Sequence, residues 1–92
     1  MSGSSEAAVA RVVRLPADVD LHARPAGVLV RAAATLETPV TLRANGREAS
    51  ARSILQVLAL GATRGSAIEV EASGEGAEAA VDAVAELLAA LA

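Results

Sequence analysis

His22 is the only histidine in this 92-residue chain, which contains no cysteine. Arg24 and Pro25 follow it, and the apolar residues beyond them recur at helical spacing, so we expect a helix to begin directly after His22. Helix starts usually carry Ser, Thr, Asp or Asn, whereas a cation in the first turn opposes the helix dipole at a cost of about 0.3–1 kcal/mol. This departure indicates an anion site, because free N–H groups at a helix start and an arginine side chain both bind phosphate.

A neutral imidazole can accept a phosphoryl group as a nucleophile, and that transfer needs mainly positioning and charge stabilisation. We therefore interpret His22 as a candidate phosphoryl acceptor and Arg24 as the residue that stabilises the phosphate. A solvated histidine beside a plain surface arginine is the simpler alternative, and the residues alone leave it open. Asp18 and Asp20 could join His22 as metal ligands, but one short loop offers no fourth ligand, so we expect no metal.

Ser53 precedes a second apolar segment and is suited to cap a short helix over Ile54–Leu60 that ends at Gly61. This segment is too uniformly apolar for a short surface helix to bury on one side. We therefore expect Ile54, Leu55 and Leu58 to form an exposed patch for a partner protein. A fully buried core helix is the alternative.

The other elements predict a sheet for the helices to cover. Strands are expected at Val9–Leu15 and Ala67–Ala72, and Asn45-Gly46 predicts a hairpin formed by Val40–Ala44 and Arg47–Ala51. Two longer helices each have an apolar stripe. In the first helix, Ala23–Leu36, the stripe consists of Val28, Leu29, Ala32, Ala33 and Leu36. In the second helix, in residues 76–92, it consists of Val81, Val84, Leu88 and Leu91. The outer face of this second helix carries the acids Glu78, Asp82 and Glu86. The order predicts an α+β fold (βαββαβα): a four-stranded, mainly antiparallel sheet with three helices on one face.

The composition narrows the function classes. The length fits a single domain over residues 8–92, after a disordered leader at residues 1–7. No apolar run suits a signal peptide or a membrane span, and the absence of cysteine gives no sign of an oxidising compartment, so we expect a cytoplasmic protein without membrane insertion. Eight arginines against eleven acids, with no aromatic residue, argue against nucleic-acid binding. The chain shows no acid/base pair, Gly-rich nucleotide loop or cofactor motif, so we expect no cofactor and no independent enzymatic activity.

The run LHARPAG around His22, followed 31 residues later by Ser53 in ARSILQVLALG, resembles the HPr family of phosphocarriers of the phosphoenolpyruvate-dependent sugar phosphotransferase system. The resemblance covers about Val9 to Leu91. It implies an open-faced β-sandwich in which His22 takes a phosphoryl group on Nδ1 from the phosphohistidine of enzyme I and passes it to an enzyme IIA, while Arg24 stabilises the group. Such a carrier is phosphorylated stoichiometrically, is not a conventional enzyme and is expected to be a monomer.

The resemblance also implies a docking face and a regulatory site. Ala23 and Gly27 would join Ile54, Leu55 and Leu58 in binding enzyme I and enzyme IIA, and Ser53 would be open to phosphorylation by a Ser-specific HPr kinase.

Asp20 departs from the family pattern, which usually has Gly two residues before the active histidine. A carboxylate there could cap the helix N–H groups or repel the incoming phosphate. The open alternatives are a nitrogen-type or dihydroxyacetone-kinase phosphotransfer branch, and a regulatory interaction module that is not phosphorylated.

Overall fold

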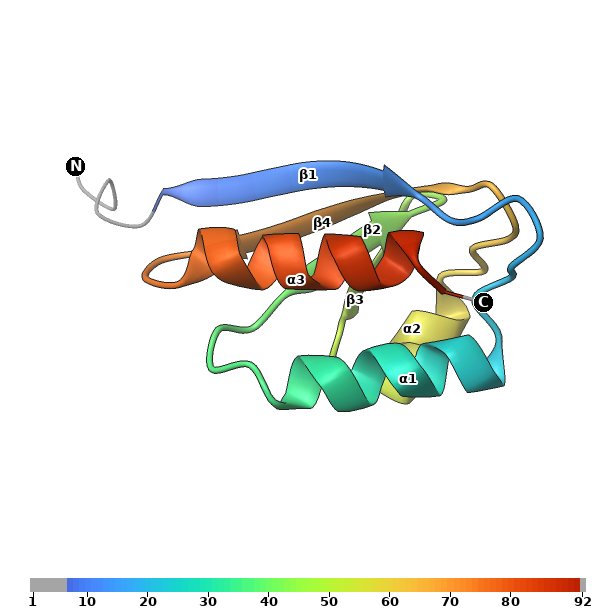
Figure 1. The fold of residues 1–92 in the computed structure, drawn as a ribbon, viewed down its shortest axis with the longest axis horizontal. Helices are drawn as coiled ribbons and strands as arrows, with labels where there is room; N and C mark the ends of the chain where they lie inside the picture. The colour runs from blue at the N-terminus through green and yellow to red at the C-terminus, as the bar shows by residue number, and fades with distance from the viewer. Residues whose placement is uncertain (1–6, 92) are drawn as a thin grey trace.

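The computed structural model describes residues 7–91 of the chain (Figure 1). The elements follow one another as β1 (Ala8–Arg14), α1 (Ala23–Ala34), β2 (Thr41–Ala44), β3 (Arg47–Ser50), α2 (Ile54–Ala59), β4 (Ala67–Ser73) and α3 (Ala77–Ala89). This is the predicted βαββαβα order, with boundaries that differ by at most three residues. Of the leader predicted at residues 1–7, all but Ala7 lies outside the described residues.

The four strands form one antiparallel sheet in the order β1-β4-β2-β3. Val70 of β4 pairs with Arg11 on one side and with Leu42 of β2 on the other, and Leu42 in turn pairs with Ala49 of β3. β4 therefore joins the first strand to the central hairpin, although it is the last strand in the sequence. As expected, the helices cover one face of this sheet, and the other face is left open (Figure 1).

The hairpin between β2 and β3 turns at the predicted dipeptide. Asn45 and Gly46 have φ angles of 55° and 73°. Positive φ at both central residues is the conformation that twists a two-residue turn to match its strands, and Asn and Gly adopt it at the lowest cost. The turn sets the register in which Arg43 faces Glu48 across the two strands.

The core is aliphatic. Its largest fully buried side chains come from all three helices, from β2 and β4 and from the C-cap of α2: Leu29, Leu42, Val57, Leu60, Ile68, Val70, Val81 and Leu88. The predicted stripe of α3 is buried at Val81, Val84 and Leu88, whereas Leu91 lies beyond the helix and is half-buried.

The stripe predicted for α1 needs two corrections. Ala26, Leu29 and Ala33 form its buried side, whereas Val28, predicted to be buried, is 38 % exposed. The reason is that Val28 borders an open cleft toward α3. The helix also ends two residues early, because Thr35 takes the C-cap position and its hydroxyl donates to the carbonyl oxygen of Ala32.

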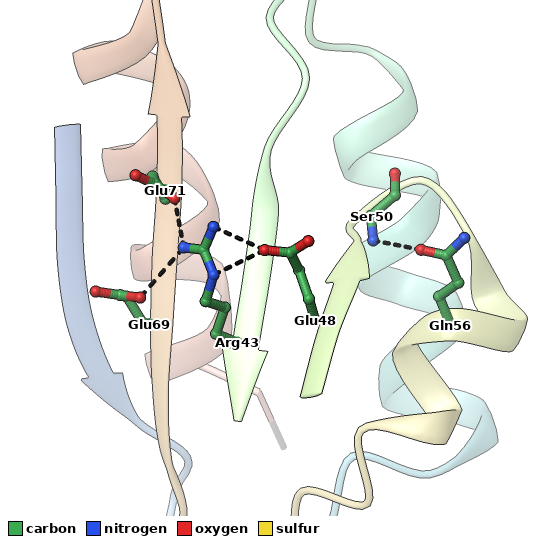
Figure 2. Close-up of polar contacts among 6 residues, drawn as sticks. All are labelled: Arg43, Glu48, Ser50, Gln56, Glu69 and Glu71. Atoms are coloured by element: carbon green, nitrogen blue, oxygen red, sulfur yellow. Dashed lines mark hydrogen bonds and ion pairs between the residues drawn. The ribbon is translucent and has the colours of Figure 1, made fainter. Parts of the chain in front are cut away.

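An ion-pair network lies on the open face of the sheet (Figure 2). The guanidinium of Arg43 lies 2.7 Å from the Glu48 carboxylate and 3.2 Å from that of Glu69, and it also contacts Glu71. These three carboxylates raise the pKa of Arg43 above its ordinary value, chiefly through the hydrogen bond to Glu71. The network links β2, β3 and β4 on the face that no helix covers.

Within residues 7–91, no helix combines the length and the apolar character that would take it across a membrane.

Candidate functional site

His22 occupies the N-cap of α1, with extended backbone angles of φ −91° and ψ −164°. Pro25 stands in the first turn, where its missing N–H removes no intrahelical hydrogen bond. The first helical bond runs from the N–H of Ala26 to the carbonyl oxygen of His22 at 2.8 Å. The proline and its neighbours therefore fix the start of the helix at His22, as the sequence predicts.

The imidazole of His22 is exposed and makes no capping hydrogen bond. Among the hydrogen bonds of the described residues, neither the ring nor the N–H groups of Ala23 and Arg24 have a protein partner. These two N–H groups lie at the positive end of the helix dipole, and α1 has no acidic residue in its first turn. The start of α1 therefore combines a free nucleophile with unpaired donors.

The side chain of Arg24 lies on the side of α1 that faces α3. With Pro25 and Val28 it borders an open cleft of about 610 Å³, whose opposite wall includes Glu86 and Leu91. Figure 1 shows the start of α1 beside the end of α3. His22 is not among the residues that line this cleft, so Arg24 and His22 share the helix start without sharing a pocket. Arg24 has no ion-pair partner within residues 7–91.

The carboxylate of Asp20 does not cap the N–H groups of α1, so the capping effect considered for this residue is wrong. Its Oδ1 accepts the backbone N–H of Arg64 at 2.8 Å and lies 3.7 Å from the Nε of Arg64. The hydrogen bond from the backbone N–H of Arg64 holds the pKa of the Asp20 carboxyl below its ordinary value. The charges of Arg64 and His22 also lower this pKa. The carboxylate therefore points to the loop before β4, and the N–H groups of α1 stay free.

Ser53 is the N-cap of α2, as predicted. Its Oγ accepts the backbone N–H of Gln56 at 3.2 Å, and its carbonyl oxygen accepts the N–H of Val57. The side chain of Gln56 reaches back to accept the N–H of Ser50 at 2.8 Å (Figure 2). These bonds fix the angle at which α2 leaves the end of β3.

The apolar run of α2 is divided between the core and the surface. Val57 and the C-cap residue Leu60 are buried, whereas Leu55 is 77 % exposed and Ile54 and Leu58 are each 38 % exposed. The alternative of a fully buried helix is therefore wrong. α2 packs on α1, where Ala23 is exposed and Gly27 is half-buried, so the five residues named for docking lie on two adjacent helices.

The contact between Arg64 and Asp20 could not be seen in the sequence. Arg64 lies 44 positions after Asp20, in the turn before β4, and no local pattern links the two residues. Within residues 7–91, no group of three or more His, Cys, Asp or Glu side chains is arranged to hold a metal ion.

Known proteins resemble this chain in sequence and in fold. The family model described as "PTS HPr component phosphorylation site" matches residues 9–90. The phosphocarrier protein HPr of Streptomyces coelicolor is 49 % identical over 70 residues, 75 % of each chain, and that of Vibrio cholerae is 33 % identical over 83 % of this chain and 89 % of its own. The crystal structure of an HPr from Bacillus anthracis superposes with a TM-score of 0.83 at 29 % identity, covering 89 % of this chain and 98 % of that one.

Proposed function

The chain belongs to the HPr family of phosphocarriers of the phosphotransferase system, and we propose that His22 is the residue that carries its phosphoryl group. The observation behind this assignment is the exposed, unbonded imidazole at the N-cap of α1, next to the free N–H groups of Ala23 and Arg24. A helix start with unpaired N–H groups favours a phosphate, and no other histidine is present.

The proposed reaction is a transfer between two nitrogen atoms. The lone pair of Nδ1 of His22 forms the new N–P bond, while the N–P bond of the donor breaks and its electron pair returns to the donor imidazole. The N–H groups at the start of α1 stabilise the phosphoryl oxygens, and Arg24 turns from the cleft toward them when the group arrives. No cofactor or metal enters the step, and the carrier turns over only when it passes the group on.

Enzyme I is the proposed donor and an enzyme IIA the proposed acceptor. Ala23 and Gly27 of α1, with Ile54, Leu55 and Leu58 of α2, form the proposed docking face. Ala23 follows His22 directly in the chain, and α2 packs on α1, so a partner seated on these two helices would reach the imidazole. We further propose that residues 8–92 act as one monomeric domain in the cytoplasm.

Ser53 is the proposed regulatory site. Ser53 is half-buried, and its hydroxyl caps α2 directly before Ile54 and Leu55. A phosphate on Ser53 would stay compatible with the start of a helix but would place a double negative charge against the apolar docking face. Phosphorylation by a Ser-specific kinase would therefore weaken docking without unfolding the domain.

The test is phosphoryl acceptance from enzyme I and phosphoenolpyruvate, followed by phosphorus NMR. Wild type is expected to show one phosphohistidine signal and His22→Ala none, with unchanged circular dichroism. Arg24→Ala is expected to accept phosphate roughly ten- to hundredfold more slowly, since a charge-assisted hydrogen bond is worth about 1.5–3 kcal/mol. Arg31→Ala, at the other end of α1, is the matched control and should transfer like wild type.

The donor is tested in the same assay. Faster phosphorylation by the enzyme I of a nitrogen-type or dihydroxyacetone-kinase branch would reassign the branch but keep His22. A wild-type protein that binds enzyme I yet stays unmodified would favour the interaction module. Equal acceptance by wild type and His22→Ala would overturn the assignment.

A further inference from the structure

Asp20 makes two contacts that hold the segment before α1 in place. Its carbonyl oxygen accepts the N–H of His22 at 2.9 Å, and its carboxylate accepts the N–H of Arg64 at 2.8 Å. The first contact shapes the backbone immediately before the N-cap. The second ties the same residue to the loop that leads into β4.

A backbone hydrogen bond at the next residue connects the same two segments. The N–H of Leu21 donates to the carbonyl oxygen of Ala62 at 3.1 Å, and the side chain of Leu21 is buried. The segment before His22 is therefore fastened to residues 61–66 at two successive positions. Only the Asp20 contact uses a side chain, so it can be removed by substitution without changing the backbone.

The negative charge of Asp20 is compensated by Arg64. Asp20 is only two residues from the proposed phosphoryl acceptor, where a free carboxylate would repel a phosphate. Its Oδ1 faces the N–H of Arg64 and lies 3.7 Å from the guanidinium Nε, so donors and a cation surround it. The lowered pKa of Asp20 agrees with this pairing.

We propose that Asp20 is a positioning residue for His22: by binding the backbone of Arg64, its carboxylate fixes the segment that presents the imidazole. This inference rests on the proposed role of His22 as phosphoryl acceptor. Among the described residues, the Asp20 carboxylate makes no hydrogen bond or ion pair with the imidazole, and it acts through the backbone.

Two substitutions separate the hydrogen bond from the charge. Asp20→Ala removes both, and Asp20→Asn keeps an oxygen that can accept the N–H of Arg64. Asp20 has no positive φ angle, so both replacements suit its backbone. Asp18→Ala is the matched control, because Asp18 is an exposed acid on the same loop without a hydrogen bond or ion pair among the described residues.

The first measurement is amide hydrogen exchange of the unphosphorylated protein by NMR. Asp20→Ala is expected to speed exchange at Arg64 and at His22 about fivefold, the population change that one such hydrogen bond supports. Asp20→Asn should restore most of the protection, and Asp18→Ala should leave it unchanged. Unchanged exchange at both amides in Asp20→Ala would overturn the proposal.

The second measurement is the rate of phosphoryl acceptance from enzyme I as the concentration of the carrier is varied. Asp20→Ala should lower kcat about fivefold with little change in KM, and Asp20→Asn should recover at least half of the loss. An Asp20→Asn variant as slow as Asp20→Ala would assign the effect to charge and overturn the positioning role. If wild type is not phosphorylated on His22, the proposed function fails, while the exchange data still decide whether Asp20 holds this segment.

Discussion

Asn45 donates from its side-chain Nδ2 to the carbonyl oxygen of Leu60 at 2.9 Å and to that of Gly61 at 3.1 Å. The turn residue of the β2–β3 hairpin thereby caps the C-terminal end of α2. Since α2 carries most of the proposed docking face, one turn residue links the sheet to that face.

Replacing Asn45 tests this link. Asn45→Ala loses the two hydrogen bonds and places alanine at a positive φ angle, which alanine adopts less readily than Asn or Gly. It should therefore lower the free energy of unfolding by about 2 kcal/mol. Asn45→Gly loses the bonds but suits the backbone, and it should cost about 1 kcal/mol. Urea denaturation measures both. Equal losses for the two variants would mean that the hydrogen bonds contribute all of the effect and the backbone none.

Ser53→Ala removes the side-chain cap of α2. The substitution leaves the N–H of Gln56 without its acceptor and should lower the free energy of unfolding by about 1 kcal/mol. Thermal and urea unfolding measure the loss, and Ser53→Thr should keep most of the stability. Ser73→Ala, an exposed serine at the end of β4, is the control and should stay within about 0.5 kcal/mol of wild type. A Ser53→Ala protein as stable as wild type would contradict the capping role.

Elements defined by local chemistry could be predicted from the sequence. Pro25 sets the start of α1, Asn45-Gly46 sets the hairpin, and Gly61, with a φ of 66°, follows the end of α2. Each signal acts within one turn of backbone, so reading neighbouring residues is sufficient. The placement of His22 at an exposed N-cap follows from the same local rules.

Contacts between distant residues could not be predicted in this way. The order β1-β4-β2-β3 depends on strand pairings that no short pattern encodes, and the bond between Asp20 and Arg64 joins two loops. The exposure of Val28 likewise depends on how α1 sits against α3. Helical periodicity places Val28 near an apolar face but does not show that this face borders an open cleft.

The pH dependence of stability should report the contact between Asp20 and Arg64. The folded-state pKa of Asp20 is lowered, so the contact stabilises the fold above the unfolded pKa of about 3.9 and is lost as the pH falls through the folded value. The stability difference between wild type and Asp20→Asn should therefore be fully present at about pH 5 and shrink as the pH falls below about 4. Urea denaturation across this range measures it, with Asp18→Asn as the control for losing one negative charge on the loop. A difference that grows as the pH falls below about 4 would have the wrong sign for this contact.

Gly27 separates helix stability from docking. A Cβ at this position would meet only the Nη1 of Arg31, at an ordinary 3.5 Å, so the protein itself does not require glycine there. Gly27→Ala should raise the free energy of unfolding by up to about 1 kcal/mol, the difference in helix propensity. If a partner packs closely on α1, the added methyl group should also raise KM for enzyme I about fivefold, equivalent to about 1 kcal/mol, and leave kcat unchanged.

Ala79→Gly, at an exposed position of α3, is the matched control for Gly27→Ala. It should lower stability without moving KM, because it makes the opposite change in helix propensity away from the proposed docking face. A Gly27→Ala protein that is more stable and has an unchanged KM would show that partners do not approach α1 at this residue. The docking face would then have to lie on α2 alone, around Leu55, whose side chain is 77 % exposed.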